Sequence, residues 1–561
     1  MSFARLPNEI IEGIAHELDS GRDIKNLRLV NKQLDHAASL VLWTTKPVVV
    51  SIDKNSFKDA IAMLQELPNT PRVTKSVRAL IFKSISPSFN PEGHREFANS
   101  VDSARNALRV SREWIRQTKE DTIASERVKD LLPGFVSALV GLRSVRWNMT
   151  LDDPEWAWQV VMECSSSLPA LETLSVTCPV LHRGLDTFNN PLHLFPHGTL
   201  KEITLNVTAT FSAVPSSFHT FLSEIIHNNR KLEVISIRTY YIASSASSEP
   251  FAFHTIFDKL PSSYPLPLRK LVINLPKVQL SAKVLEQMKS IRHLELTETL
   301  RGHNIALGAD TLWPALQEER IHLRTLVMKS RVNEALIDYL ESFSSLEAID
   351  INIGSSGNNN DLARRFFENV IPLHKDTLKH VFIKPITMSF WAINFERLRG
   401  FYSCKNLVSL SVCVDFDADE NEDSVATLIH LSVSLESLRS LELDCTRKGL
   451  DAFFRMSRVL EALQKQRDAR KRLYKLMQNL RLEKLIREPH PKLLVNVFQA
   501  GPPMLANLPQ NVSVAIPNEC HSFGVQRHEV DGTVYYTFRQ LNDSDADTTG
   551  DAAPNDQDDS R

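Results

Sequence analysis

Residues 171–176 read Leu-Glu-Thr-Leu-Ser-Val, and this spacing of apolar residues decides the fold because it returns along the chain. The same phrase, apolar-x-x-apolar-x-apolar, recurs as Leu200-Lys-Glu-Ile203-Thr-Leu205 and as Leu438-Arg-Ser-Leu441-Glu-Leu443. Its eleven copies begin at Leu142, Leu171, Leu200, Leu232, Leu268, Ile291, Leu323, Leu346, Leu378, Leu407 and Leu438. The mean step is about 30 residues, and a step of this size is typical of a repeat array.

Each repeat is predicted to hold one strand and one helix. The end of the phrase alternates apolar and polar residues, which predicts a strand, and the stretches between phrases, such as 221–226 and 335–340, predict helices. Strands at 48–52 and 77–82, with a helix at 57–67 between them, are predicted as the entry to the array. The pattern resembles the irregular leucine-rich repeat, which implies an α/β solenoid with parallel strands on one face and helices on the other.

Residues 6–43 predict three short amphipathic helices before the array. In the first helix, Ile10, Ile14 and Leu18 are spaced by four residues, which places them on one helix face. Asn31 is suited to cap the third helix, because its side chain can accept from a free backbone N–H. A unit of about 40 residues buries too little surface to be stable alone. Its apolar faces must therefore pack on the rest of the chain or on a partner.

The residues of these helices follow a definite order. They are Leu6-Pro7-x-Glu9-Ile10, Ile14, Leu18, Asp23-Ile24-x-x-Leu27, Val30-Asn31-Lys32 and Leu42-Trp43. This order resembles the F-box, a three-helix unit that binds the Skp-type adaptor of a cullin-based ubiquitin ligase. The resemblance implies that the adaptor is contacted by Leu6, Pro7, Ile10, Ile14, Leu27 and Val30. The alternative is that these helices only cap the first repeat, and an apolar face already buried by the repeats would favour that alternative.

The sequence predicts five parts. The first is an F-box-like helical unit at 1–45, and the second, at 46–141, is the solenoid entry with a charged helical insertion that is out of phase with the repeats. The repeat array follows at 142–450, and a basic helical stretch with a closing hairpin at 451–540. Asp531-Gly532 predicts the hairpin turn, since this pair tolerates the positive φ of a type I′ turn. Residues 541–561 hold seven Asp and almost no large apolar side chain, which predicts disorder.

Residues at alternate strand positions, all polar except for one aromatic, are predicted to form the exposed face of the sheet, since alternate side chains point to opposite faces. They are Thr173, Ser175, Thr204, Asn206, Ser236, Arg238, Glu295, Asp350, Asn352, Phe382, Lys384, Glu442 and Asp444. The face is mixed in charge, which favours binding of a target protein. The residues predicted to contact that target are Ser175, Asn206, Arg238, Glu295, Asp350, Phe382, Lys384 and Glu442.

The composition excludes several classes of protein. The 561 residues carry 65 basic and 67 acidic side chains, a formal net charge of −2, which argues against a nucleic-acid-coating or polybasic membrane protein. No stretch is long and apolar enough for a transmembrane helix, and the opening residues 1–10 do not resemble a secretory signal. We therefore expect a protein inside the cell, in the cytoplasm or the nucleus. The six cysteines are far apart and form no CxxC pair, which argues against a disulfide framework and a zinc ribbon.

No motif of catalysis or cofactor binding is found in the sequence. The phosphate-loop, dinucleotide, serine-hydrolase and HExxH patterns are missing. Asp415-x-Asp417-x-Asp419 is similar to the start of a calcium loop, but Glu420 stands where that loop needs glycine, so no metal is expected. These expectations describe a non-catalytic substrate receptor of a Skp-cullin-F-box type ligase. The alternatives are a leucine-rich-repeat scaffold unrelated to ubiquitin and an enzyme, which would need a deep polar pocket with converging titratable groups.

Overall fold

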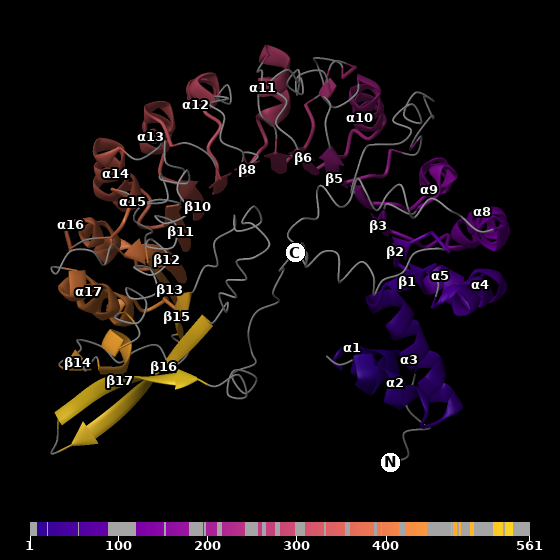
Figure 1. The fold of residues 1–561 in the computed structure, drawn as a ribbon, viewed down its shortest axis with the longest axis horizontal. Helices are drawn as coiled ribbons and strands as arrows, with labels where there is room; N and C mark the ends of the chain where they lie inside the picture. Colours follow the sequence, from indigo (N-terminus) through magenta and orange to yellow (C-terminus); the bar gives the residue numbers. More distant parts are fainter. Residues whose placement is uncertain are drawn as a thin grey trace, which may run out of the picture. The chain divides into compact units, whose positions relative to one another are not determined.

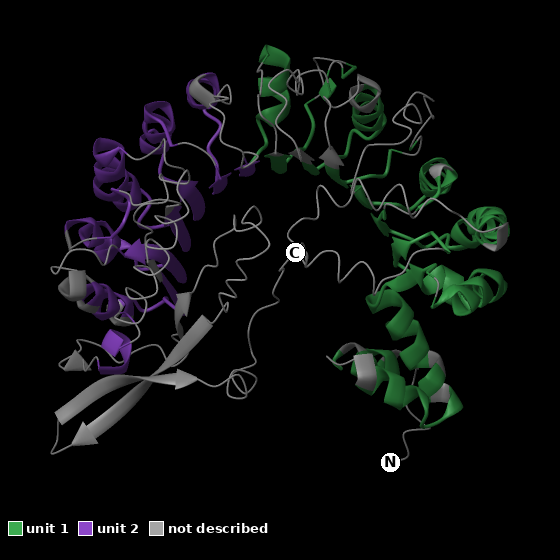
Figure 2. Ribbon diagram, viewed as in Figure 1, with its two compact units in different colours: residues 1–291, 299–308 green, residues 292–298, 309–561 purple. Residues whose placement is uncertain are grey.

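The computed structural model forms two compact units, which are described separately here (Figure 2). Unit 1 comprises residues 1–291 and 299–308, and unit 2 comprises residues 292–298 and 309–561. The residues that the structure describes are 8–18, 21–53, 55–87, 119–150, 153–178, 195, 198–209, 216–241, 256–257, 259–260, 265–274, 281–297, 309–329, 332–353, 359–385, 390–393, 395–414, 421–445, 473, 475–479, 482–483, 494–498, 520–530 and 533–541.

Unit 1 begins with three helices and continues as alternating strands and helices. The helices are α1 (Asn8–His16), α2 (Gly21–Arg28), α3 (Lys32–Thr45), α4 (Phe57–Glu66), the 3-10 helix η2 (Leu67–Asn69), α5 (Pro71–Ser76), α8 (Lys119–Ala138), α9 (Glu155–Ser166), α10 (Ser216–Asn228) and α11 (Ala282–Met288). The strands are β1 (Val48–Ser51), β2 (Ala79–Ser84), β3 (Ser144–Asn148), β4 (Thr173–Cys178), β5 (Glu202–Ala209), β6 (Val234–Tyr241) and β7 (Lys270–Asn274).

The strands β1 to β7 pair in chain order, and every pair is parallel. Figure 1 shows the helices from α4 to α11 on one side of these strands. A parallel sheet in chain order follows from the sequence, because helices such as α4, α8, α9 and α10 lie between consecutive strands and return the chain to the same edge. The register keeps the phrase aligned, with Val145 opposite Leu174 and Leu174 opposite Ile203.

Unit 2 continues the same alternation and ends in antiparallel strands. Its helices are α12 (Ala309–Glu318), α13 (Glu334–Glu341), α14 (Asn360–Arg365), the π-helix η6 (Phe366–Val370), α15 (Ile371–Leu373), α16 (Phe395–Leu398), the 3-10 helix η7 (Arg399–Ser403) and α17 (Asn421–Ser434). Its strands are β8 (His293–Thr297), β9 (Thr325–Lys329), β10 (Ala348–Ile353), β11 (His380–Pro385), β12 (Ser409–Val414), β13 (Ser440–Cys445), β14 (Leu482–Glu483), β15 (Leu494–Phe498), β16 (Cys520–Val530) and β17 (Thr533–Leu541).

The strands β8 to β13 are parallel neighbours, and β15 pairs in parallel with β13. The predicted hairpin is present as β16 and β17, which pair antiparallel with Val530 opposite Thr533. β16 also pairs antiparallel with β15, so the hairpin closes the sheet as the sequence predicts. Asp531-Gly532, the predicted turn, and residues 542–561 lie outside the described residues.

The repeated phrase fills the core of both units. All eleven leading residues of the phrase are at most 1% exposed, as are its later members Val145 and Trp147. The prediction of an α/β repeat with parallel strands and buried phrase residues is therefore confirmed. Parallel sheets covered by helices need apolar residues at these positions, because the helix layer removes one face of each strand from water.

Two expectations for the flanking segments need correction. The charged stretch from 91 to 130 was expected to lie out of phase with the repeats, but its described end belongs to α8, which packs between α4 and α9 in the helix layer. The basic stretch 451–488 was expected to be one long helix. Its described part is helical at 475–479, but Leu482–Glu483 forms β14 and pairs with β17 opposite Tyr535 and Tyr536.

Candidate protein-interaction surfaces

The three N-terminal helices have a core of their own. It consists of Ile11, Ala15, Ile24, Leu34, Ala37, Ala38, Val41 and Leu42, all buried, with Leu18 and Leu27 packed against it. α3 contacts both α1 and α2. The side chain of Asn31 accepts a hydrogen bond of 2.8 Å from the backbone N–H of Leu34, which confirms the predicted cap of α3. The helices therefore need no residue of the repeats to complete their core.

Four large apolar side chains of α1 and of the turn between α2 and α3 are exposed. Ile10 is 52% exposed, Ile14 39%, Leu29 84% and Val30 65%. They are four of the ten exposed large hydrophobic residues found in the part of the chain that the structure describes. Scattered single apolar residues are normal on a protein surface, but four of them within 21 positions make these helices a candidate binding surface. We call Ile10, Ile14, Leu29 and Val30 the exposed apolar set.

The six residues predicted to contact the adaptor do not all have the same exposure. Ile10, Ile14 and Val30 belong to the exposed apolar set, whereas Leu27 is half-buried against the helices' own core. Leu6 and Pro7 lie outside the described residues. The sequence pattern missed Leu29, which directly precedes Val30 in the turn after α2 and could have been found as an unassigned apolar residue there.

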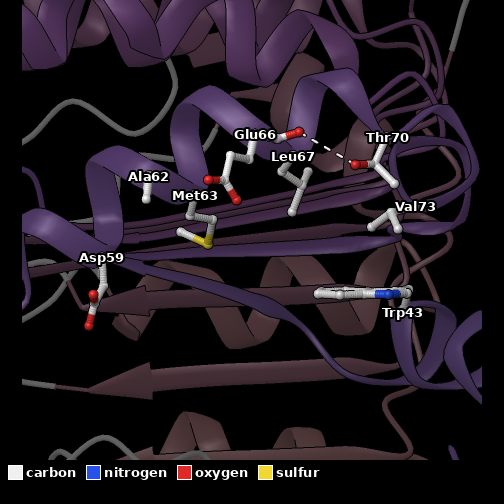
Figure 3. Close-up of a pocket in the computed structure, with 8 residues that line it drawn as sticks. All are labelled: Trp43, Asp59, Ala62, Met63, Glu66, Leu67, Thr70 and Val73. Atoms are coloured by element: carbon white, nitrogen blue, oxygen red, sulfur yellow. Dashed lines mark hydrogen bonds between the residues drawn. The ribbon is translucent and has the colours of Figure 1, made fainter.

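The N-terminal helices join the repeats at a shallow groove (Figure 3). The groove is lined by Trp43, Asp59, Ala62, Met63, Glu66, Leu67, Thr70 and Val73. Trp43 belongs to α3, and the other residues belong to α4, η2, α5 and the residue between the last two. Asp59 and Glu66 are the only titratable side chains that line the groove. The other lining residues are apolar or uncharged, as is typical of a contact between packed helices.

Both sheets have an open face, which we define as the face opposite the described helices. In unit 1 the residues that share this face are Ile81, Lys83, Arg146, Asn148, Ser175, Thr177, Thr204, Asn206, Ser236 and Arg238, from β2 to β6. The register brings Asn206 next to Arg238, and Ser175 next to Thr204. Three predicted target-binding residues, Ser175, Asn206 and Arg238, therefore lie on one face. Ser236, expected to be exposed, is buried.

The open face of unit 2 carries charges of both signs. One register row consists of Glu295, Val327, Asp350, Phe382, Ser411 and Glu442, in strands β8 to β13. It contains four of the predicted target-binding residues. The fifth, Lys384, lies two residues beyond Phe382, and its Nζ is 3.6 Å from Oε2 of Glu442.

Asp350 is the most enclosed carboxylate of this row. Burial raises its pKa, and the charges of Glu295 and Glu442 act in the same direction, while Lys329 and Lys384 oppose the shift. A carboxylate that is partly removed from water binds more strongly to a cation or a donor that reaches it. The arrangement can therefore hold a charged or polar side chain of a partner, but its own lysines already balance much of its charge.

Sequence reasoning missed several residues of these faces. Lys329 lies on the neighbouring strand β9, two residues beyond Val327, and its charge acts on Asp350. His380 of β11 lies 3.2 Å from Ser409, measured from Nδ1 to Oγ. Burial lowers the pKa of His380, Lys379 adds to the shift, and Glu347 opposes it. Arg146 and Lys83 were missed in unit 1, although the same period-two rule applied to β2 and β3 selects them.

The chain was compared with known proteins. No family model matches it, and no curated protein matches it. In the described residues no group of three or more His, Cys, Asp or Glu is placed to hold a metal ion. No described helix is both long and apolar enough to cross a bilayer.

Proposed function

We propose that this chain is the substrate-recognition subunit of a Skp-cullin-F-box type ubiquitin ligase. In this role the N-terminal helices bind the Skp-type adaptor, the adaptor connects the chain to the cullin scaffold, and the repeat array holds a target protein. Such a ligase acts in the cytoplasm or the nucleus, which agrees with our expectation from the sequence. The observation that supports the proposal best is the exposed apolar set on a helical unit whose own core is complete.

The exposure of these residues speaks against the main alternative. If the helices only capped the first repeat, their outward apolar residues would be buried by the repeats, but Ile10, Ile14 and Val30 are exposed. Full burial of a side chain of this size by a partner contributes about 1.5–3 kcal/mol. Covering three or four of them therefore provides several kcal/mol toward association, before the entropic cost of binding is subtracted.

The proposed mechanism is tethering. A chain that holds an adaptor at one surface and a target at another raises the local concentration of target lysines near the ubiquitin-loaded enzyme. Effective concentration and orientation accelerate the transfer without a catalytic group in the receptor. The receptor is therefore proposed to be non-catalytic and to need no cofactor.

A pull-down tests the proposal. The purified full-length chain should retain a purified Skp-type adaptor, and Ile10→Asp combined with Val30→Asp should abolish retention, because two charges would enter an apolar interface. The matched control is Glu17→Ala combined with Lys25→Ala, which changes two exposed polar residues, one directly after α1 and one in α2. Circular dichroism should show equal helix content in all three proteins. Failure of the wild type to retain the adaptor, or equal retention by the Asp variant, would contradict the proposal and favour the scaffold alternative.

A further inference from the structure

Asp350 of β10 lies half-buried in the open face of unit 2. Its two neighbours in the register row are apolar, with Val327 of β9 on one side and Phe382 of β11 on the other. Within the part of the chain that the structure describes, no group donates a hydrogen bond to its carboxylate and no cation forms an ion pair with it. Because removing a carboxylate from water without a donor is costly, Asp350 is suited to a partner that supplies one.

The lysines near Asp350 act on it only through their charge. Burial is the main cause of its raised pKa, which Lys329 and Lys384 oppose and which Glu295 and Glu442 increase. The Nζ atom of Lys384 lies 3.6 Å from Oε2 of Glu442, so this lysine is held by another carboxylate. Together with Asp350, these residues are three carboxylates and two ammonium groups. One further cation at Asp350 would balance the charge of these five residues.

Asn352 provides a second, independent observation. It lies two residues after Asp350 in β10 and therefore on the same face of the sheet. Its Oδ1 atom is buried and accepts no hydrogen bond from any described residue. Phe382, directly opposite Asp350 on β11, adds a half-buried aromatic ring to the same face. Two acceptors that lack a donor and one aromatic ring thus occupy neighbouring positions of β10 and β11.

We infer that Asp350, Asn352 and Phe382 bind an arginine side chain of a partner protein. The guanidinium donates two N–H groups to the carboxylate of Asp350 and a third to Oδ1 of Asn352, and its plane stacks on the ring of Phe382. Arginine suits these residues because it has five donors and no acceptor, and because an aromatic face attracts its charge. The arginine is an anchor of the target protein, so its biological role rests on the proposed function.

Two other cations fit these residues less well. Lysine has a compact, strongly hydrated ammonium group that cannot stack on an aromatic ring. A metal ion needs several ligands around one point, but Glu295 lies two strands and Glu442 three strands from Asp350, about 10 and 14 Å at about 4.8 Å a step. These two carboxylates are therefore too far away to share an ion with Asp350.

Saturation-transfer NMR with the full-length chain tests the inference, because it detects weak binding of a small peptide. The probe is the peptide Gly-Ser-Ala-Arg-Ala-Ser-Gly, and its two references carry lysine or citrulline at the central position. Citrulline has the shape of arginine but no charge. The arginine peptide should bind at least about tenfold more tightly than the citrulline peptide and about threefold to fivefold more tightly than the lysine peptide.

Three variants test the role of each side chain. Asp350→Asn should weaken binding of the arginine peptide at least about tenfold and leave the citrulline peptide within about twofold, because it removes only the charge. Phe382→Leu should abolish the preference for arginine over lysine, since the stacking ring is lost. Asn352→Ala should weaken binding of the arginine peptide several-fold, since it removes the amide oxygen that accepts from the guanidinium.

The matched control is Glu318→Gln, which removes an exposed carboxylate at the end of α12. It changes the net charge as Asp350→Asn does and should leave the affinity within about twofold, because an exposed charge on another surface is screened. A purely structural role of Asp350 would give a different result. Its carboxylate has no described hydrogen bond to lose, so Asp350→Asn should unfold at the same urea concentration as the wild type or at a higher one.

Four results would overturn the inference. They are no binding of the arginine peptide, equal affinity for the arginine and citrulline peptides, an equal loss of affinity in the control, and a large loss of stability in Asp350→Asn. Equal affinity for the arginine and lysine peptides would indicate a general cation site and overturn the choice of arginine.

The binding of arginine and the proposed function can fail separately. Asp350→Asn should still retain the Skp-type adaptor, and Ile10→Asp with Val30→Asp should still bind the arginine peptide. A wild type that binds the arginine peptide but no adaptor would contradict the ligase role alone. A wild type that retains the adaptor but binds the peptide equally well with and without the Asp350 charge would contradict this inference alone.

Discussion

Acidification should destabilise unit 2 through one buried histidine, His374. The residue is 1% exposed and lies at the end of α15. Its Nδ1 accepts from the backbone N–H of Leu346 at 3.3 Å, and its Nε2 lies 3.1 Å from the carbonyl oxygen of Leu340. An N–H can only donate and a carbonyl can only accept, so the proton of the neutral ring must be on Nε2. Protonation of Nδ1 would break the bond to Leu346 and bury a charge.

The size of the effect follows from the pKa. Burial lowers the pKa of His374 from 6.5 to about 4, although interactions with the backbone of Leu340 and of Ser344 oppose the shift. Because the folded state then binds fewer protons than the unfolded state, the free energy of unfolding falls as the pH decreases from about 6.5 toward 4. The complete shift corresponds to about 3.5 kcal/mol, at about 1.4 kcal/mol for each unit by which the pKa is lowered. Between pH 7.5 and pH 5.0, His374 should account for a loss of about 2 kcal/mol.

This loss can be measured by urea unfolding of the wild type and of His374→Gln at about pH 7.5 and about pH 5.0. Circular dichroism follows the unfolding. Glutamine does not titrate, so the free energy of unfolding of the variant should fall by about 2 kcal/mol less than that of the wild type. The same replacement at His430, which is exposed on α17, controls for the removal of a histidine. If the wild type and His374→Gln lost equal stability between pH 7.5 and 5.0, the argument from burial would be refuted.

Three substitutions test the packing, each by the free energy of unfolding in urea. Gly400→Ala should destabilise the protein by about 1–3 kcal/mol, because a Cβ there would meet a backbone carbonyl oxygen of η6. Gly13→Ala should stabilise it by about 0.5–1 kcal/mol, because a Cβ in α1 would meet nothing within 4 Å; a loss of stability would contradict the helix. Tyr339→Phe should cost about 1–3 kcal/mol, because the buried hydroxyl donates to Ile321 and accepts from Leu323; no change would mean that both backbone groups find other partners.

The repeat could be predicted from the sequence because its information is local. Each phrase needs only the spacing between its own apolar residues and a neighbouring phrase of the same kind, as expected for an array stabilised by contacts between adjacent repeats. Leu171 and Leu174 are therefore placed correctly without knowledge of any distant residue. The variable spacing between phrases did not matter, because additional residues are taken up between strands and helices without a change in the strand register.

The same reasoning could not predict which face of α1 packs into the core of the three N-terminal helices. Ile10 and Ile14 form one stripe at spacing four, and Ile11 and Ala15 form a second stripe about 100° away. The sequence left open whether the first stripe packs on the chain or on a partner, and in the structure the core takes Ile11 and Ala15 while Ile10 and Ile14 are exposed. The small side chain of Ala15 packs in one cluster with Ala38 of α3, and only the packing of the three helices decides between the two stripes.

Pairing between strands that are far apart in the chain could not be predicted from the sequence either. Leu482 follows a helical pattern, yet it forms β14 because β17, about fifty residues later, offers a free edge opposite Tyr536. Similarly, the raised pKa of Asp350 reflects its burial together with charges from four other strands, which only the register brings together. Sequence periodicity identified the residues of the open faces, but the charge balance of each face is a property of the assembled sheet.

The joint at Trp43 connects two of the proposed binding surfaces. α3 contributes to the core of the N-terminal helices at its beginning and reaches α5 at its end, so the exposed apolar set and the open face of unit 1 lie in one compact unit. Tethering depends on this continuity, because the effective concentration of a held target falls as the connection between the two surfaces becomes longer and more flexible. A helix that ends in a packed joint limits that flexibility more than a linker of the same length would. The proposed function therefore requires α3 and its joint as much as either binding surface.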